Sequence, residues 1–305
     1  MSPRYYDCSI DFTGGWGGTA LNEQRIAVIT DTGTDTPAEF VREHDVRIVP
    51  LRIIFSDGAT YESGVTITPE ELVARLPQEI PTTSLPSPEV IRDTFEQARA
   101  DGYTSAIFVS ISSGLSATCH TVRMVADALE DFPVTVVDTL NIGIAAGTVV
   151  IEAVNMIELG VPYGMLGPAL EAVARKTSVW FSVKTLTYLR KGGRISEAVY
   201  RVGKVLNIKP VITCDDKGYY VMARKARGWE KSLDTEVMLA AQKARTYPKV
   251  RLAICCSATC EMFHELETKL RAQIDNVADV VYSGVSADLL VHTGPDLVGI
   301  CVQGL

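Results

Sequence analysis

Histidine is scarce in this chain, and so are the motifs that mark common catalytic and nucleotide-binding sites. The sequence has four histidines, His44, His120, His264 and His292, and their spacing pairs none of them with a serine as a nucleophile would require. It contains no GxxxxGK[ST] phosphate loop, no strand-linked GxGxxG and no HExxH. These absences disfavour covalent serine catalysis, nucleotide binding at a phosphate loop and zinc-dependent hydrolysis.

Long apolar runs are also missing. No stretch reaches about 18 uninterrupted apolar residues, and the N-terminus lacks the charged segment and apolar core of a secretory signal. Seven cysteines, an odd number without a regular framework, fit a reducing compartment. We therefore expect a cytoplasmic protein without stable membrane insertion.

Three residues spaced four apart, Cys256, Cys260 and His264, would line one face of a helix and could hold a metal ion. The alternative is that the cysteines are small core residues, because no CxxC pair accompanies them. We favour the second interpretation and expect neither a metal nor a cofactor.

Positive charge is in deficit, with 29 basic against 37 acidic residues and a formal net charge of −8. This balance disfavours general nucleic-acid binding. The distribution is uneven, because residues 184–231 carry 12 Lys or Arg and 4 Asp or Glu. That segment is either a docking surface for an anionic partner or a solvated face whose charges share a sign.

The hydrophobic pattern predicts an α/β protein with two domains. Strand and helix patterns alternate from residue 25 onward, which indicates βαβ crossovers and a parallel sheet. After residue 179 the strands shorten, and a turn at residues 215–218 predicts a β-hairpin. We expect a flexible extension over residues 1–24 without an assigned role, an N-terminal parallel-sheet domain over 25–165, and a smaller C-terminal domain with a mixed sheet over 166–305.

Three local predictions refine this outline. Residues 46–55 have the pattern of one strand. Thr36 and Pro37 resemble an N-cap and a first helical residue, and residues 68–71 form a capping box.

The triplet Asp31-Thr32-Gly33 is shared with aspartic proteases, but those need two such aspartates, and the later Asp138-Thr139-Leu140 lacks the glycine. We therefore reject the protease interpretation.

Two hydroxyl-rich stretches are the candidate binding site. Residues 112–116, SSGLS, follow an apolar strand pattern and precede a helical one, so they lie where a helix N-terminus offers free N–H groups to an anion. Residues 82–87, TTSLPS, are held extended by their prolines ahead of a helix that Pro88 starts. The alternative is that these hydroxyls are ordinary caps and solvated turn residues.

The stretches TSLPS and SSGLSAT resemble the paired loops of the DegV family of fatty-acid-binding proteins. Three further patterns of that family follow in order, YLRKGGRIS, LNIKP and HTGP, and the resemblance covers about residues 25–305. It implies a long-chain fatty acid as the ligand, in a tunnel near the domain junction.

Residue by residue, the resemblance implies that Thr83 and Ser116 hold the carboxylate, with Ser84 beside them and His292 approaching from the other domain. Gly192, Gly193 and Arg194 would help close the site or face a partner. The family glycine after the second serine is Ala117 here, and its methyl group is tolerated if the backbone φ is negative.

The resemblance also implies a partner, because bacterial members serve as the acyl-presenting subunit for a separate, ATP-dependent fatty acid kinase. The docking surface would then include Arg190, Lys191, Arg194 and Arg201. The leading hypothesis is thus a lipid-binding protein that is not itself an enzyme. The alternatives are a stand-alone enzyme acting on a small anionic or phosphorylated substrate and a nucleotide-binding regulatory module. Fatty acid binding requires a deep apolar cavity, whereas the enzyme would need a shallow polar pocket with a paired acid or base.

Overall fold

A computed structural model describes residues 21–203, 207–257 and 261–305. Residues 1–20 of the expected N-terminal extension lie outside these ranges. Residues 21–24 contact the domain that follows: the Asn22 side chain donates to the carbonyl of Ile26 at 2.8 Å, and the Gln24 amide donates to the carbonyl of Ile157 at 2.9 Å.

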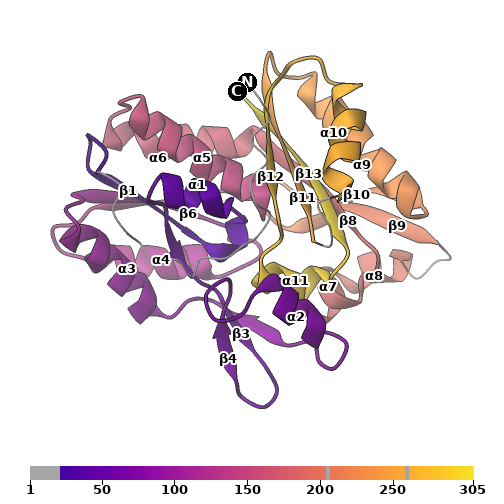
Figure 1. Cartoon of the computed structure of the whole chain (residues 1–305), viewed down its shortest axis with the longest axis horizontal. Helices are drawn as coiled ribbons and strands as arrows, with labels where there is room; N and C mark the ends of the chain where they lie inside the picture. The colour runs from indigo at the N-terminus through magenta and orange to yellow at the C-terminus, as the bar shows by residue number, and fades with distance from the viewer. Residues whose placement is uncertain (1–20, 204–206, 258–260) are drawn as a thin grey trace.

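The N-terminal domain is built on a parallel sheet, whose order is β2-β1-β6-β7. These strands are β2 (Arg47–Val49), β1 (Ile26–Asp31), β6 (Ser105–Ser110) and β7 (Val134–Asp138). Alternate side chains along β1 and β6 face opposite layers of helices. One layer holds α1 (Ala38–Glu43), α5 (Ile144–Glu158) and α6 (Tyr163–Arg175), and the other holds α3 (Pro88–Ala100) and α4 (Thr118–Asp127) (Figure 1).

The C-terminal domain is built on a mixed sheet of order β10-β9-β8-β13-β11-β12, in which β11 and β12 are the parallel pair. Its strands are β8 (Thr177–Val183), β9 (Ile208–Cys214), β10 (Tyr220–Arg227), β11 (Val250–Cys256), β12 (Val277–Ser283) and β13 (Leu297–Gly304). Helices α9 (Trp229–Ala244) and α10 (Glu261–Arg271) cover its outer face, and α5 packs on its inner face as well as on the parallel sheet (Figure 1). The predicted fold class is therefore confirmed.

Short elements fill the junction between the two sheets (Figure 1). An antiparallel sheet of order β4-β3-β5 projects from the N-terminal domain. Its strands are β3 (Arg52–Ile54), β4 (Thr60–Glu62) and β5 (Thr82–Ser84). Beside it lie α2 (Pro69–Arg75), α7 (Thr187–Lys191), α8 (Glu197–Gly203) and α11 (Ala287–Thr293). Residues from both halves of the sequence therefore meet here.

Several local predictions are confirmed. Thr68 forms the capping box of α2 with Glu71, and residues 215–218 connect β9 to β10 as a hairpin turn. The expected division between residues 165 and 166 falls inside α6, a helix that packs on α5 and β7.

Two predictions of local structure are wrong. Residues 46–55 are not one strand: β2 and β3 belong to different sheets, because Pro50 between them has no N–H to continue a ladder. Thr36 does not cap α1. The N-cap is Pro37, and the Thr36 hydroxyl instead bonds that of Thr34 at 2.9 Å.

The metal hypothesis also fails on geometry. Cys256 ends strand β11 and is buried, whereas His264 lies on α10, so these residues do not share a helix face. Cys260 lies outside the described residues. No cluster of three or more His, Cys, Asp or Glu able to hold a metal occurs within the described ranges.

Candidate functional site

A cavity of about 470 Å³ lies at the domain junction, and both hydroxyl-rich stretches line it. We call it the junction cavity. Its polar lining comes from the loop that follows β6, from β5, from α11 and from Arg194, which follows α7. The lining residues are Leu51, Thr83, Ser84, Leu85, Ile111, Ser113, Gly114, Leu115, Ser116, Ala117, Ile142, Arg194, Tyr220, Asp288, Leu289, His292 and Thr293.

Strand β5 presents Thr83 and Ser84 to the cavity. Its antiparallel neighbour β3 fixes the register, with Ile53 opposite Thr83. Arg52 of β3 donates to the Ser84 hydroxyl and to the Leu85 carbonyl, both at 3.2 Å. Ser84 is therefore already engaged by a cation on its own domain, whereas the Thr83 hydroxyl faces the other domain.

His292 meets Thr83 from α11, with its Nε2 2.8 Å from the threonine hydroxyl. Burial, and secondarily the charge of Arg194, lower the pKa of His292 to about 3, so the ring is neutral at pH 7. Its Nδ1 has no hydrogen-bond partner among the described residues. An orphan N–H costs more than an orphan acceptor, so we assign the proton to Nε2. The ring then donates to Thr83, and the threonine hydrogen stays free for a ligand.

Gly192 is a glycine because His292 lies against it. A Cβ built on Gly192 would be 2.0 Å from Nδ1 of the imidazole. The backbone at Gly192 is ordinary, with φ −74°, whereas Gly193 has φ +70° and an open surrounding. Glycine is therefore required at the two positions for different reasons. At Gly192 the imidazole leaves no room for a Cβ, and at Gly193 the backbone has a left-handed φ.

Arg194 supplies positive charge to the cavity. Its guanidinium is half-buried and donates to the Gly192 carbonyl at 2.5 Å. Burial lowers the pKa of Arg194, which reflects the cost of keeping this cation out of water. Arg194 lines the cavity, whereas Gly192, Gly193 and Arg201, which were also expected to close the site or face a partner, do not.

The serine stretch, residues 112–116, is hydrogen-bonded to the C-terminal domain. The Ser112 hydroxyl donates to the carbonyl of Gly218, at the tip of the β9–β10 hairpin, at 2.9 Å, and accepts from the N–H of Gly114 at 3.0 Å. A Cβ on Gly114 would come within 2.8 Å of the hairpin backbone. The hairpin tip therefore closes directly over the loop that carries Ser116.

Ser116 stands two residues before α4. Its hydroxyl accepts from the N–H of Thr118 at 3.2 Å and lies 2.8 Å from the Thr118 hydroxyl. Ala117, in place of the family glycine, has φ −76°, so its methyl group costs no backbone strain. When the Thr118 hydroxyl donates to Ser116, the Ser116 hydrogen is free for a ligand.

Besides the polar residues Ser113, Asp288 and Thr293, the remaining walls are apolar, and the sequence alone did not identify these apolar walls. They are formed by Leu51, Ile111, Leu115, Ile142, Leu289 and the ring of Tyr220. Tyr220 packs edge-to-face on Phe181, with ring centroids 5.1 Å apart. Tyr220 opens β10, the strand that follows the predicted hairpin turn, but nothing in the sequence around it marked it as a lining residue.

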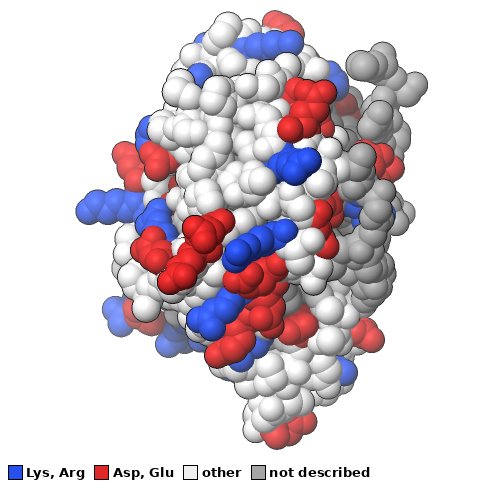
Figure 2. Space-filling model, turned by 90° about the vertical axis from the view of Figure 1, so that its left-hand side faces the viewer, with Lys and Arg blue, Asp and Glu red and all other residues white. Residues whose placement is uncertain are grey.

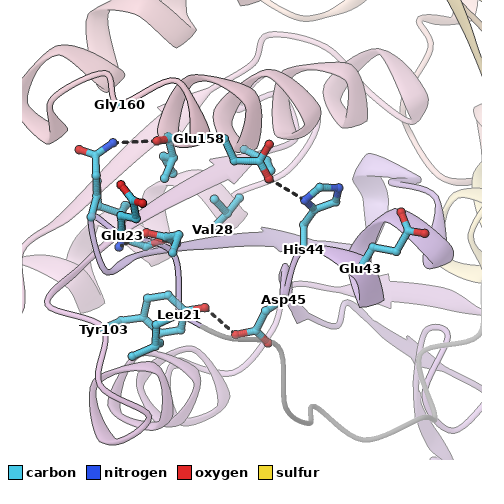
Figure 3. Close-up of a pocket in the computed structure, with 14 residues that line it drawn as sticks. Leu21, Glu23, Val28, Glu43, His44, Asp45, Tyr103, Glu158 and Gly160 are labelled. Atoms are coloured by element: carbon cyan, nitrogen blue, oxygen red, sulfur yellow. Dashed lines mark hydrogen bonds and ion pairs between the residues drawn. The ribbon is translucent and has the colours of Figure 1, made fainter.

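A second cavity, of about 380 Å³, lies at the other end of the parallel strands, where β1 begins. Figure 3 shows His44 pointing toward Glu158 and Tyr103 toward Asp45, with hydrogen bonds of 3.0 and 2.7 Å. Its described lining includes four carboxylates and no Lys or Arg. The described lining of the junction cavity has one carboxyl, Asp288, whose pKa is raised by burial, and one guanidinium, Arg194, so the junction cavity suits an anion better than this cavity does.

The expected docking residues other than Arg194 lie outside the junction cavity. Arg201 has a side chain 78% exposed and pairs with Glu197 at 3.6 Å, while Arg190 pairs with the same carboxylate at 3.1 Å and stacks on Tyr200. Elsewhere basic and acidic side chains lie beside one another, as on the face shown in Figure 2.

No helix in the described part of the chain is long and apolar enough to cross a membrane.

Known proteins share this architecture. Residues 25–304 match the family model described as an uncharacterised protein of the DegV family. A DegV domain-containing protein of Clostridium acetobutylicum is 34% identical over 91% of this chain and 98% of its own length, and one of Clostridium perfringens is 31% identical over 92% and 99%.

Among solved structures, a DegV family protein from Thermus thermophilus, described by its fatty acid binding, has a TM-score of 0.85 at 30% identity and covers 92% of this chain and 100% of its own. A DegV lipid-binding protein from Thermotoga maritima, at 24% identity, shares the fold with a TM-score of 0.82 over 92% and 98%. The chain belongs to the DegV family.

Proposed function

We propose that this protein binds a long-chain fatty acid in the junction cavity, with the carboxylate at Thr83, Ser116, His292 and Arg194. The observation that carries the proposal is the composition of that cavity, in which hydroxyls, an imidazole and a guanidinium adjoin apolar walls. The fatty acid binding described for the relative from Thermus thermophilus supports it.

The head group is recognised by donors. The Thr83 hydroxyl donates to the carboxylate because its own acceptor position is occupied by the His292 ring. Arg194 offsets the negative charge, and Ser116 adds a second hydroxyl donor. Charge-assisted hydrogen bonds of this kind contribute about 1.5–3 kcal/mol each, which is enough to prefer an acid over a neutral lipid.

The tail supplies most of the affinity. About 14 buried methylene groups contribute on the order of 11 kcal/mol gross at ~0.8 kcal/mol each, before the cost of association. The head group therefore sets orientation and charge preference, and the extent of the apolar walls sets chain length.

The site geometry argues against a stand-alone enzyme. Thr83 and His292 form a hydroxyl–imidazole pair, but no described residue bonds Nδ1 to orient the ring as the third member of a triad does. With a pKa of about 3, His292 is also a weak general base. We infer that the protein is non-catalytic and presents its fatty acid to a separate ATP-dependent kinase that forms the acyl phosphate.

Thr83→Ala combined with Ser116→Ala tests the binding site. We expect at least a tenfold loss of affinity for hexadecanoic acid, measured by displacement of a fluorescent fatty acid, with an unchanged melting temperature. The matched control is Thr82→Ala with Thr121→Ala, which removes one hydroxyl from β5 and one from the first turn of α4, the helix that follows Ser116, both outside the cavity. Equal affinity in the two double variants would contradict the site.

Arg201→Glu tests the presentation step. In an assay with an ATP-dependent fatty acid kinase, we expect acyl-phosphate formation to fall while fatty acid affinity stays unchanged, because Arg201 is exposed and outside the cavity. Arg175→Glu is the control, since Arg175 also pairs with a glutamate one turn away, at 3.8 Å on α6. Equal rates for both variants would remove Arg201 from the kinase surface.

A further inference from the structure

The triplet Asp31-Thr32-Gly33, which resembles a protease motif, lies at the junction cavity without lining it. Asp31 ends β1, and the next three residues form a single 3-10 turn, Thr32–Thr34. All three triplet residues are buried, and the Asp31 carboxylate is fully so. A buried carboxylate needs donors, and the identity of these donors shows what the triplet does.

Asp31 holds the start of the serine stretch. Its Oδ2 accepts from the backbone N–H of Ile111 at 3.0 Å and from the Ser110 hydroxyl at 3.4 Å, while its Oδ1 accepts from the N–H of Gly33 at 3.0 Å. Ile111 is the residue directly before Ser112, and it lines the cavity. Burial raises the pKa of Asp31 to about 7, and the donors from Ile111 and Gly33 act against that rise.

Gly33 leaves the space that Ile111 occupies. A Cβ on Gly33 would lie 3.1 Å from Cδ1 and 3.2 Å from Cγ2 of Ile111. The isoleucine therefore packs directly on the triplet backbone, so the same wall of the cavity is fixed by a hydrogen bond to its main chain and by contact with its side chain.

Thr32 holds the other half of the site. Its hydroxyl oxygen accepts from the N–H of Leu51 at 3.1 Å. Leu51 lines the cavity and directly precedes β3, the strand that sets the register of β5 and hence of Thr83. Asp31 at the end of β1 and Thr32 at the start of the 3-10 turn therefore hold the two segments that carry the proposed head-group hydroxyls.

We propose that Asp31 and Thr32 are positioning residues that hold the serine stretch and the β3–β5 segment so that Ser116 and Thr83 converge on one carboxylate. The proposal rests on the proposed function. Neither residue touches the ligand, and each acts through the backbone N–H that it accepts, of Ile111 or of Leu51.

Asp31→Asn removes one hydrogen-bond acceptor and keeps the shape of the side chain. Both carboxylate oxygens accept an N–H, from Gly33 and from Ile111. An amide has one oxygen and one NH₂ group, so whichever way it turns, a donor faces a donor. The shape of the side chain is kept while one of the two restraints is lost.

The readout is head-group discrimination, which a purely structural role would not change selectively. We would measure the affinities of tetradecanoic acid and tetradecan-1-ol by competition with a fluorescent fatty acid. We expect Asp31→Asn to lower the acid-over-alcohol preference by at least tenfold and to leave the affinity for the alcohol within about threefold, because the tail contacts remain.

Glu236→Gln is the matched control, an amide replacement of an equally buried carboxyl on α9 and remote from the cavity, and it should keep the wild-type preference. Thr32→Val, nearly isosteric and acting on the Leu51 side, should lower the preference in the same way and decides the question if Asp31→Asn does not fold. If both triplet variants fold and keep the wild-type preference, the inference is wrong.

The same data separate this inference from the proposed function. Loss of the preference in Thr83→Ala/Ser116→Ala but not in the triplet variants would overturn the positioning role alone. A wild-type protein that binds neither tetradecanoic acid nor the alcohol would overturn both.

Discussion

The imidazole of His292 lies 2.8 Å from the hydroxyl of Thr83, so a residue of the C-terminal half completes the hydrogen bonding of a residue in the N-terminal half. Because burial keeps the ring neutral, it can donate to Thr83 without adding charge to the site. In the proposed function, this contact links the junction of the domains to recognition of the head group.

Gly192→Ala should damage this contact. The new methyl group would lie 2.0 Å from Nδ1 of His292 and would push the ring away from Thr83. We expect at least a tenfold weaker affinity for hexadecanoic acid together with a lower melting temperature.

The control for that variant is Gly164→Ala in α6, where a Cβ meets nothing within 4 Å. It should keep or slightly raise the stability of the protein, since alanine favours helix and Gly164 lies in the first turn of α6, and leave binding unchanged. Wild-type affinity in Gly192→Ala would show that the His292 position does not matter.

Gly218→Ala should open the cavity. Gly218 has φ +77°, and a Cβ there would lie 1.9 Å from the Ser112 hydroxyl that anchors the hairpin tip. We expect faster dissociation of a fluorescent fatty acid in stopped-flow measurements.

Gly58→Ala separates backbone strain from this contact, because Gly58 also has a left-handed φ, +88°, but no atom within 4 Å of its Cβ position. It should lose stability and keep the wild-type dissociation rate. Identical dissociation rates in the two variants would exclude the hairpin tip as a closure of the site.

Glu236→Gln should stabilise the protein at alkaline pH. Burial in the C-terminal core raises the pKa of Glu236 well above its usual range, so the folded state keeps a proton that the unfolded state releases above about pH 4.5. The free energy of unfolding of the wild type therefore falls as pH rises from the pKa of Glu236 in the unfolded state to its pKa in the folded state. The loss is about 1.4 kcal/mol for each unit by which the two pKa values differ.

The amide cannot ionise, so the variant should be the more stable protein at pH 8 and equal to the wild type at pH 4, as measured by urea unfolding. Glu171→Gln, at an exposed carboxylate, should show no such difference. A wild type that is the more stable protein at pH 8 would contradict the assignment of a protonated Glu236.

The sequence predicted the parts of the site that depend on local chemistry. The hydroxyl stretches were found because serine, threonine and proline cluster at strand ends, and His292 and Arg194 because their motifs resemble those of a family. Of the polar residues found in this way, those that line the junction cavity are Thr83, Ser84, Ser113, Ser116, Arg194 and His292.

Other features of the site depend on contacts between segments far apart in the chain, so the neighbouring sequence could not predict them. Gly192 was expected to help close the site or face a partner, but the space beside it is occupied by an imidazole a hundred residues away. Tyr220 gave no signal of its own, and Asp31 resembled a motif of another class until its donors were known. The split of residues 46–55 into two sheets follows Pro50, a residue whose consequence depends on the pairing partners.

The central claim, that the junction cavity holds a fatty acid, is tested most directly by native mass spectrometry of the purified protein followed by organic extraction. We predict a stoichiometric mass increase that resolves into one or two long-chain fatty acids in the wild type and is lost in Thr83→Ala/Ser116→Ala. A lipid-free wild-type spectrum that stays unshifted after incubation with a panel of fatty acids would contradict the account.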